Sequence, residues 1–135
     1  MWAFGLAGRP HTFRTFMGTF TKTAVPKAGP IELTLWLLRR RRRYRVTGES
    51  MYPTLSAGDV VFVNTRAPIN ENEIVCARHP HDPSIVVIKR VGFTDEDDQL
   101  FLLSDNPHAP DSADSNRFGR LSPDRVEGVV TSILQ

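Results

Sequence analysis

Two residues of this sequence, Ser50 and Lys89, could supply a nucleophile and a base. Ser50 lies between Gly48 and Pro53, so it is predicted to sit on a rigid turn. Lys89 is the one lysine beyond residue 45, in a chain that has fourteen arginines and three lysines. Arginine stays protonated in proteins, whereas a lysine that is removed from water can lose its proton and act as a base.

The chemistry open to this pair is attack on a carbonyl. A serine hydroxyl is a poor nucleophile until a base removes its proton, and a neutral lysine could take that proton and return it to a leaving amine. Lowering a lysine pKa from about 10.4 to about 7 disfavours the charged form by about 4 kcal/mol, which burial can supply. Both residues could equally be ordinary, one in a common turn and the other on the surface. A serine–histidine–aspartate triad is a weaker alternative, because the histidines of this part of the chain lie near prolines: His79, His81 and His108.

A long loop, residues 104–119, is dense in Asp, Asn and Ser. Such side chains bond to their own backbone, and functional groups often lie on loops of this kind. Its spacing does not match a calcium-binding loop. Because Cys76 is the one cysteine, a disulfide framework and a zinc site with two thiolates are both excluded. We expect no metal and no cofactor.

The segments that would position these residues are short and apolar. Beyond residue 45, apolar runs alternate with turn clusters about every 12 residues, which predicts a mainly β protein, a small barrel or coiled sheet. Lys89 directly follows the third run. The runs are Val60–Val63, Ile74–Ala77, Ile85–Ile88, Leu100–Leu103 and Val126–Ile133.

Charge divides the chain into a basic lead-in and an acidic body. Residues 1–45 hold ten Lys and Arg with one acid, whereas residues 46–135 hold seven with fourteen acids. An acidic body argues against nucleic acid as the main partner. Residues 1–30, which have no acid and many Gly and Pro breaks, are predicted to be a disordered extension or a targeting segment, with Met17 as an alternative start. Residues 31–45 are predicted to form a short apolar, Arg-rich helix ahead of the folded domain.

The predicted helix ends in the arginine run Arg39–Arg43. Its eight mostly apolar residues would span about 12 Å, too short for a bilayer core of about 30 Å. The helix could pack on the body, or it could rest on a membrane surface with Trp36 inserted and the arginines on phosphates. We expect a cytoplasmic protein, peripheral at a membrane in the second case, rather than a secreted one.

Several of these segments together resemble the type I signal peptidase family of Ser/Lys proteases. Residues 48–55 are similar to its nucleophile box and residues 58–63 to the strand that follows. Residues 88–91 are similar to its lysine box, and residues 105–119 to its final box. Within that family the chain most resembles the small proteases that mature nickel-type superoxide dismutase, which are similar in their minimal body, Arg-rich lead-in and the Arg-His-Pro stretch at 78–80.

The resemblance implies a role for each matching residue. Ser50 would be the nucleophile, Lys89 the general base and Ser112 a serine that orients the lysine. The backbone N–H of Ser50 would form the oxyanion hole, with Gly48 at a position where some relatives add a hydroxyl. The substrate would join as an extended strand beside the segments that lead into both residues. The residues expected along this strand are Val46, Thr47, Glu49, Met51, Val86, Val87 and Ile88.

The resemblance also implies a supporting ion pair. Asp114 would pair with Arg90, and Asp105 belongs to the same supporting group. The sequence departs from the family pattern here, because Ser104 stands in place of a glycine and Asn116 in place of an arginine. A shift by one residue turns a side chain to the other face of an extended segment, so the ion pair stays open at this point.

Residues and resemblance together predict a serine endopeptidase that removes an N-terminal peptide from a precursor protein. The candidate substrate is a precursor of nickel superoxide dismutase. Two alternatives remain. One is a membrane-associated type I signal peptidase for exported proteins, which the short apolar segment disfavours. The other is a regulatory module similar to self-cleaving repressor domains, with residues 1–45 as a tether, although no helix-turn-helix pattern is present.

Overall fold

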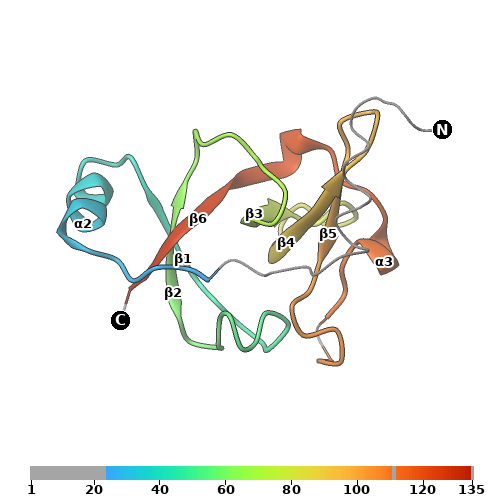
Figure 1. The fold of residues 1–135 in the computed structure, drawn as a ribbon, viewed down its shortest axis with the longest axis horizontal. Coiled ribbons are helices and arrows are strands. Elements are labelled where there is room, and N and C mark those ends of the chain that lie inside the picture. Colours follow the sequence, from blue (N-terminus) through green and yellow to red (C-terminus); the bar gives the residue numbers. More distant parts are fainter. Residues whose placement is uncertain (1–23, 111, 135) are drawn as a thin grey trace.

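The computed structural model describes residues 24–110 and 112–134. Its main feature is one six-stranded antiparallel sheet with the order β1-β2-β6-β3-β4-β5 (Figure 1). The strands are β1 (Arg42–Arg45), β2 (Val60–Asn64), β3 (Ile74–Arg78), β4 (Val86–Thr94), β5 (Leu100–Leu103) and β6 (Val126–Leu134). The short helical elements are α2 (Pro30–Leu37), α3 (Ser115–Phe118) and the 3₁₀ turn η1 (Pro123–Arg125). The predicted mainly β fold is thereby confirmed.

Apart from Ile85, which precedes β4, the five apolar runs of the sequence lie in strands, but β4 extends further than predicted. It continues past the apolar run through Lys89 and Arg90 to Thr94. Two adjacent charged residues indicate the end of a strand in a sequence, yet these side chains are 3% and 2% exposed. Buried charges are tolerated when they have partners, so the strand can pass through the core at this point.

The arginine run does not continue the helix. α2 ends at Leu37, and Arg42–Arg45 form β1, which pairs with β2 so that Tyr44 lies opposite Val61. The prediction of one helix over residues 31–45 is therefore wrong in its second half. Tyr44 packs against the core while its arginine neighbours are exposed, an alternation with the period of a strand.

Both faces of the sheet are covered by apolar side chains. The central strand β3 sends Ile74 and Cys76 to one face and Val75 and Ala77 to the other, which explains its unbroken apolar sequence. The first cluster also includes two residues just after Ser50, so the serine's turn is anchored in the core. The buried members of this cluster are Val46, Met51, Leu55, Val61, Val63, Ile74, Cys76 and Ile133.

Irregular pairing bends the sheet at three places, between β2 and β6, between β3 and β6, and between β4 and β5. The last lies at Gly92, where an added Cβ would come within 2.6 Å of Leu103 Cδ1. Bulges increase the local twist, and a glycine permits this close approach of side chain to backbone. The result is the coiled sheet that the sequence predicts, open rather than closed, with β1 and β5 at its edges.

The end of the predicted disordered extension is ordered. Ala28 N donates to Ile133 O at 2.7 Å, and Ile133 N donates to Pro26 O at 2.8 Å, so this segment lies beside β6. The expectation of disorder through residue 30 is wrong for residues 26–30, because residues 26–28 pair with β6 and Pro30 begins α2. The rest of that expectation concerns residues 1–23, which lie outside the described residues. Within the described chain, no helix has the length and apolar character to cross a membrane.

Candidate active site

The fold brings Ser50 and Lys89 into direct contact. Lys89 Nζ donates a hydrogen bond to Ser50 Oγ at 2.8 Å, although 39 residues separate the two in the chain. Both residues are buried, with exposed fractions of 7% and 3%. The distance between nitrogen and oxygen is that expected of a general base and the hydroxyl it activates.

The turn that carries Ser50 is rigid for reasons that can be read in the backbone. Gly48 has a φ of 78°, a conformation that favours glycine. A helical turn follows, in which Leu55 N donates to Met51 O at 2.9 Å. Met51 and Leu55 are buried in the core, whereas Tyr52 between them is half exposed. The hydroxyl of Ser50 is thus held toward β4 by two anchors in the apolar cluster.

Lys89 lies on β4 one residue before the strand begins to pair with β5 on its second edge. Residues Val86–Arg90 pair with β3, and Lys89 stands opposite Val75. On its other edge, β4 pairs with β5 from Arg90 onward. Among the described residues, the Val86–Lys89 half of that edge has no strand beside it. In the part of the chain that the structure describes, the edge that leads into Lys89 thus has no strand partner.

A buried ion pair ties β4 to the loop after β5. Arg90 Nε donates to Asp105 Oδ1 at 2.9 Å and Nη2 donates to Oδ2 at 2.8 Å, with both side chains almost fully buried. Thr54 Oγ1 also donates to Asp105 Oδ2, at 2.6 Å. The partner of Arg90 is therefore Asp105 and not Asp114, which corrects the expectation. Through Thr54 the pair also reaches the turn of Ser50.

Asp114 has a local role in place of the expected ion pair. Its carboxylate caps α3, accepting from Asn116 N at 3.0 Å, and it accepts from Ser104 N at 2.9 Å. Ser112, which was expected to orient the lysine, donates from Oγ to Pro107 O at 2.8 Å. The hydroxyl therefore has an acceptor in the backbone of its own loop.

Asn106 is a residue that the sequence reasoning missed. Its backbone N–H donates to Ser50 O at 2.8 Å, and its Nδ2 donates to Glu49 O at 3.1 Å. The carbonyl of Glu49 also accepts from Tyr52 N at 3.1 Å. In a trans peptide the C=O and N–H point in opposite directions, so holding this carbonyl fixes the direction of the Ser50 N–H. The available signal was the position of Asn106 directly after Asp105.

The residues expected along the substrate fall into two groups. Val46 and Met51 are core residues, 4% and 2% exposed, and the N–H and C=O of Val46 bond to Asp59 O and Gly58 N. Their side chains are buried in the core, so they cannot contact a substrate. The others, which are exposed or half-buried, are Thr47, Glu49, Val86, Val87 and Ile88.

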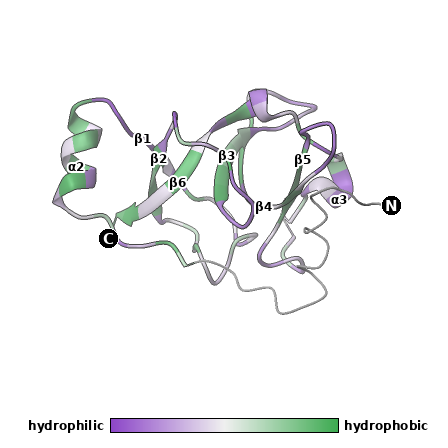
Figure 2. Cartoon of the chain, turned by 45° about the horizontal axis from the view of Figure 1, so that its top comes forward, coloured by the Kyte–Doolittle hydropathy of each residue, from purple (hydrophilic) through white to green (hydrophobic). Residues whose placement is uncertain are grey.

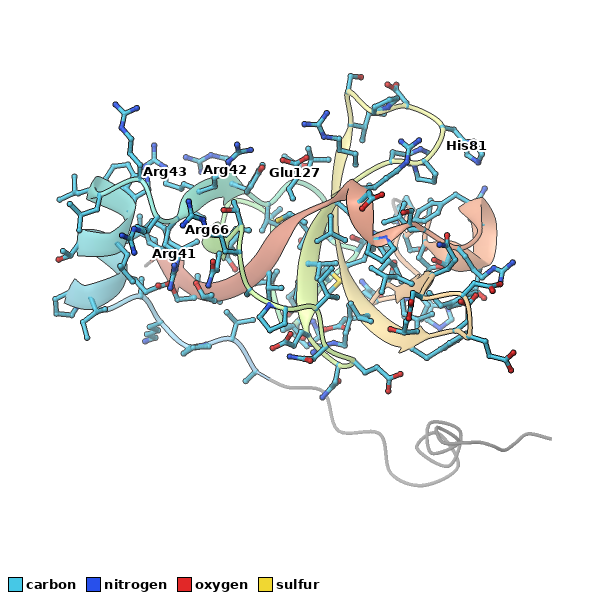
Figure 3. The ribbon with its side chains drawn as sticks, turned by 90° about the horizontal axis from the view of Figure 1, so that it is seen from above. Arg41, Arg42, Arg43, Arg66, His81 and Glu127 are labelled. Atoms are coloured by element: carbon cyan, nitrogen blue, oxygen red, sulfur yellow. The ribbon has the colours of Figure 1, made fainter. Side chains whose placement is uncertain are left out.

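The other candidate nucleophile and bases, Cys76, His79 and His81, have different surroundings. The rings of His79 and His81 pack against each other, and His79 also packs on Phe118 of α3 at 5.1 Å between ring centroids. His81 lies on the loop between β3 and β4 (Figure 3). Burial, with a contribution from the charge of Glu127, raises the pKa of the Cys76 thiol to about 12, so it is not a thiolate at neutral pH. The described residues contain no cluster of three potential metal ligands.

A buried serine hydroxyl in hydrogen-bond contact with a basic side chain is a feature of serine peptidases. The comparison with known families agrees with that class. Residues 40–118 match the Peptidase S24-like family, and the chain belongs to it. The family supports a function of the serine peptidase type, and its match begins before β1, so the domain includes this strand. No curated protein matches the sequence.

Proposed function

We propose that this protein is a serine endopeptidase in which Ser50 is the nucleophile and Lys89 the general base. The observation that carries the proposal is the 2.8 Å contact between Lys89 Nζ and Ser50 Oγ inside the protein. The same distance between Nζ and Oγ is expected when the lysine is neutral and accepts the hydrogen bond from the serine hydroxyl. Burial of an amine disfavours its charged form, which is the condition that a lysine base requires.

In the first half of the reaction, Ser50 Oγ attacks the carbonyl carbon of the scissile bond while Lys89 takes the hydroxyl proton. The C–N bond then breaks, and Lys89 returns this proton to the leaving amine. In the second half, Lys89 takes a proton from water, which attacks the acyl ester. The ester C–O bond breaks, and the proton passes back to Ser50 Oγ.

The negative oxygen formed during attack needs a donor. We assign this role to the Ser50 N–H, whose direction is set by the bond from Asn106 Nδ2 to Glu49 O. Asn106 is thus a positioning residue, because it acts through the peptide between Glu49 and Ser50. The donor to the negative oxygen is thus a backbone N–H, because Gly48 has no hydroxyl that could add a second one.

The substrate would bind as an extended strand along Val86–Ile88. The open edge of β4 offers main-chain groups for such pairing, and the edge ends at Lys89. We infer that the cleaved chain is a precursor that loses an N-terminal peptide. A nickel superoxide dismutase precursor is the candidate, supported by the minimal body, the Arg-rich lead-in and the Arg-His-Pro stretch at 78–80, in which the chain resembles the proteases that mature it.

The test is cleavage of the purified precursor by wild type, Ser50→Ala and Lys89→Arg. Arginine keeps the charge but cannot supply a neutral base, so Lys89→Arg should lose on the order of 10²-fold or more in kcat. Circular dichroism checks that each variant is folded. A folded Lys89→Arg variant with near wild-type activity would rule out the mechanism.

The same assay separates the alternatives. Cleavage of an exported preprotein in place of the dismutase precursor would favour a signal peptidase. Cleavage of the protein's own chain at a rate independent of its concentration would favour the self-cleaving module. Both outcomes would keep Ser50 and Lys89 as the reacting pair while replacing the substrate.

A further inference from the structure

The outward face of α2 is apolar. Ile31, Leu37 and Leu38 are 74%, 71% and 66% exposed, and Leu33 is 39% exposed. With 3.6 residues per turn, these side chains share one arc of the helix, interrupted by Thr34. The hydroxyl of Thr34 donates to Pro30 O, so it is directed to the helix's own backbone. We call Ile31, Leu33, Leu37 and Leu38 the α2 apolar face; Figure 2 shows the hydrophobic colouring of α2 at one end of the molecule.

α2 is fixed to the sheet by its opposite side. The Glu32 carboxylate accepts hydrogen bonds from Ser132 Oγ at 2.6 Å, from Arg41 Nε at 2.8 Å and from Thr131. Trp36 packs against Phe62 of β2 with 6.3 Å between ring centroids. Trp36 is thus directed at the body, as in the first of the two arrangements that the sequence allows for this helix. Because these contacts hold the helix, the α2 apolar face has a fixed outward orientation.

The surroundings of α2 carry positive charge. The acids at this end are already paired, Glu32 with Arg41 and Glu127 with Arg42 and Arg78. Arg39 and Arg40, both exposed, follow α2 and have no acidic partner among the described residues. Figure 3 shows Arg41, Arg42 and Arg43 gathered beside the helix. An apolar surface next to unneutralised arginines is complementary to a partner that has anionic groups at its surface and an apolar interior beneath them.

We propose that the α2 apolar face, with Arg39 and Arg40, binds the surface of an anionic phospholipid membrane. A helix of eight residues can lie in the interface with its apolar side chains below the headgroups and the arginines at the phosphates. A second copy of the chain fits this surface poorly, because two faces with the same uncompensated arginines would repel each other. The proposal does not depend on the peptidase activity.

The test uses the full chain and sedimentation with vesicles of equimolar phosphatidylcholine and phosphatidylserine. Wild type should bind these vesicles, bind phosphatidylcholine alone far more weakly, and dissociate as salt is raised. Arg39→Gln/Arg40→Gln should weaken binding about 25-fold, since each arginine at an anionic surface contributes about fivefold. Leu37→Gln/Leu38→Gln should weaken it roughly 10-fold or more, because two exposed apolar side chains are lost.

Arg117→Gln/Arg120→Gln is the control, with the same loss of formal charge at the α3 end, opposite α2 (Figure 1), where Arg120 is paired with Asp95. It should bind like wild type. Equal weakening by the control would mean that net charge alone drives binding and would overturn the proposal. Absence of wild-type binding at low salt would overturn it too, as would self-association without lipid that Leu37→Gln/Leu38→Gln abolishes. The variants alter exposed side chains, and circular dichroism checks their folding.

Discussion

Replacing Asn106 by alanine should slow catalysis without weakening substrate binding. The substitution removes the bond from Nδ2 to Glu49 O, but it keeps the backbone bond from Asn106 N to Ser50 O. The peptide between Glu49 and Ser50 then has more freedom to rotate, and the Ser50 N–H is less often directed at the negative oxygen. The Ser50–Lys89 contact and the β4 edge should be unchanged.

The size of the effect follows from the bonds that remain. Complete loss of an oxyanion donor costs about 10²- to 10³-fold in kcat, which is the upper limit here. One neutral hydrogen bond is worth about 1 kcal/mol, or about fivefold. Because Tyr52 N still holds the Glu49 carbonyl, we expect a fall of about 5- to 10-fold in kcat with little change in KM. Asn106→Asp should be worse, since a carboxylate would face that carbonyl.

The assay is steady-state cleavage together with inhibition by a peptide aldehyde, whose adduct with Ser50 places an oxygen in the oxyanion hole. Aldehyde affinity should fall in proportion to kcat, whereas a merely structural role would not link the two. Asn116→Ala is the control, an exposed asparagine of the same loop. If Asn106→Ala keeps its kcat while Ser50→Ala is inactive, the positioning argument is wrong but the peptidase proposal stands.

Three further predictions concern buried or partly buried ionisable groups. Asp105→Ala leaves Arg90 buried without its carboxylate and should lower the free energy of unfolding, measured in urea, by about 3–5 kcal/mol. Asp114→Ala removes the cap of α3 and should lower it by about 1 kcal/mol. The reverse order would contradict the assignment of the ion pair. Cys76, with its pKa raised to about 12 by burial, should resist thiol reagents at pH 8 until the protein is unfolded, and rapid native labelling would contradict its burial. Burial alone would raise the pKa of Glu32, but bonds from Ser132, Thr131 and Arg41 outweigh it and hold the pKa below its ordinary 4.5. Ionised Glu32 therefore stabilises the fold above that pH, and the stability gap between wild type and Glu32→Gln should shrink as pH falls below it; a gap independent of pH would contradict this.

The strands that could be predicted are those in which apolar residues stand between clear turn signals. The β3 run Ile74–Ala77 is an example, because both of its faces are buried. β1 could not be predicted, since five consecutive arginines hide the alternation around Tyr44 and resemble the end of a helix. The second half of β4 was missed because Lys89 and Arg90 have the residue types of a turn or surface, and only their tertiary partners permit burial.

For the candidate site, the sequence indicated which residues to consider but not how the supporting groups pair. Ser50 and Lys89 stood out through a glycine turn and the scarcity of lysine, both local properties. Asp105 and Asp114 belong to one loop and have the same chemistry, so the partner of Arg90 depends on the path of that loop. Asn106 acts through its contact with a backbone carbonyl, and its position directly after Asp105 does not by itself predict that contact.

The open half of β4 has a consequence for how this protein behaves at high concentration. Proteins usually protect a strand edge with lysine, proline or a covering segment, which prevents edge-to-edge aggregation. Here Ile85 and Val86 are 47% and 40% exposed beside an edge that must stay accessible if substrates pair with it. The protection that would keep the protein soluble would also exclude its substrate. We therefore expect high protein concentration to favour edge-to-edge pairing between copies. A short peptide that pairs with this edge should inhibit cleavage and should also reduce aggregation.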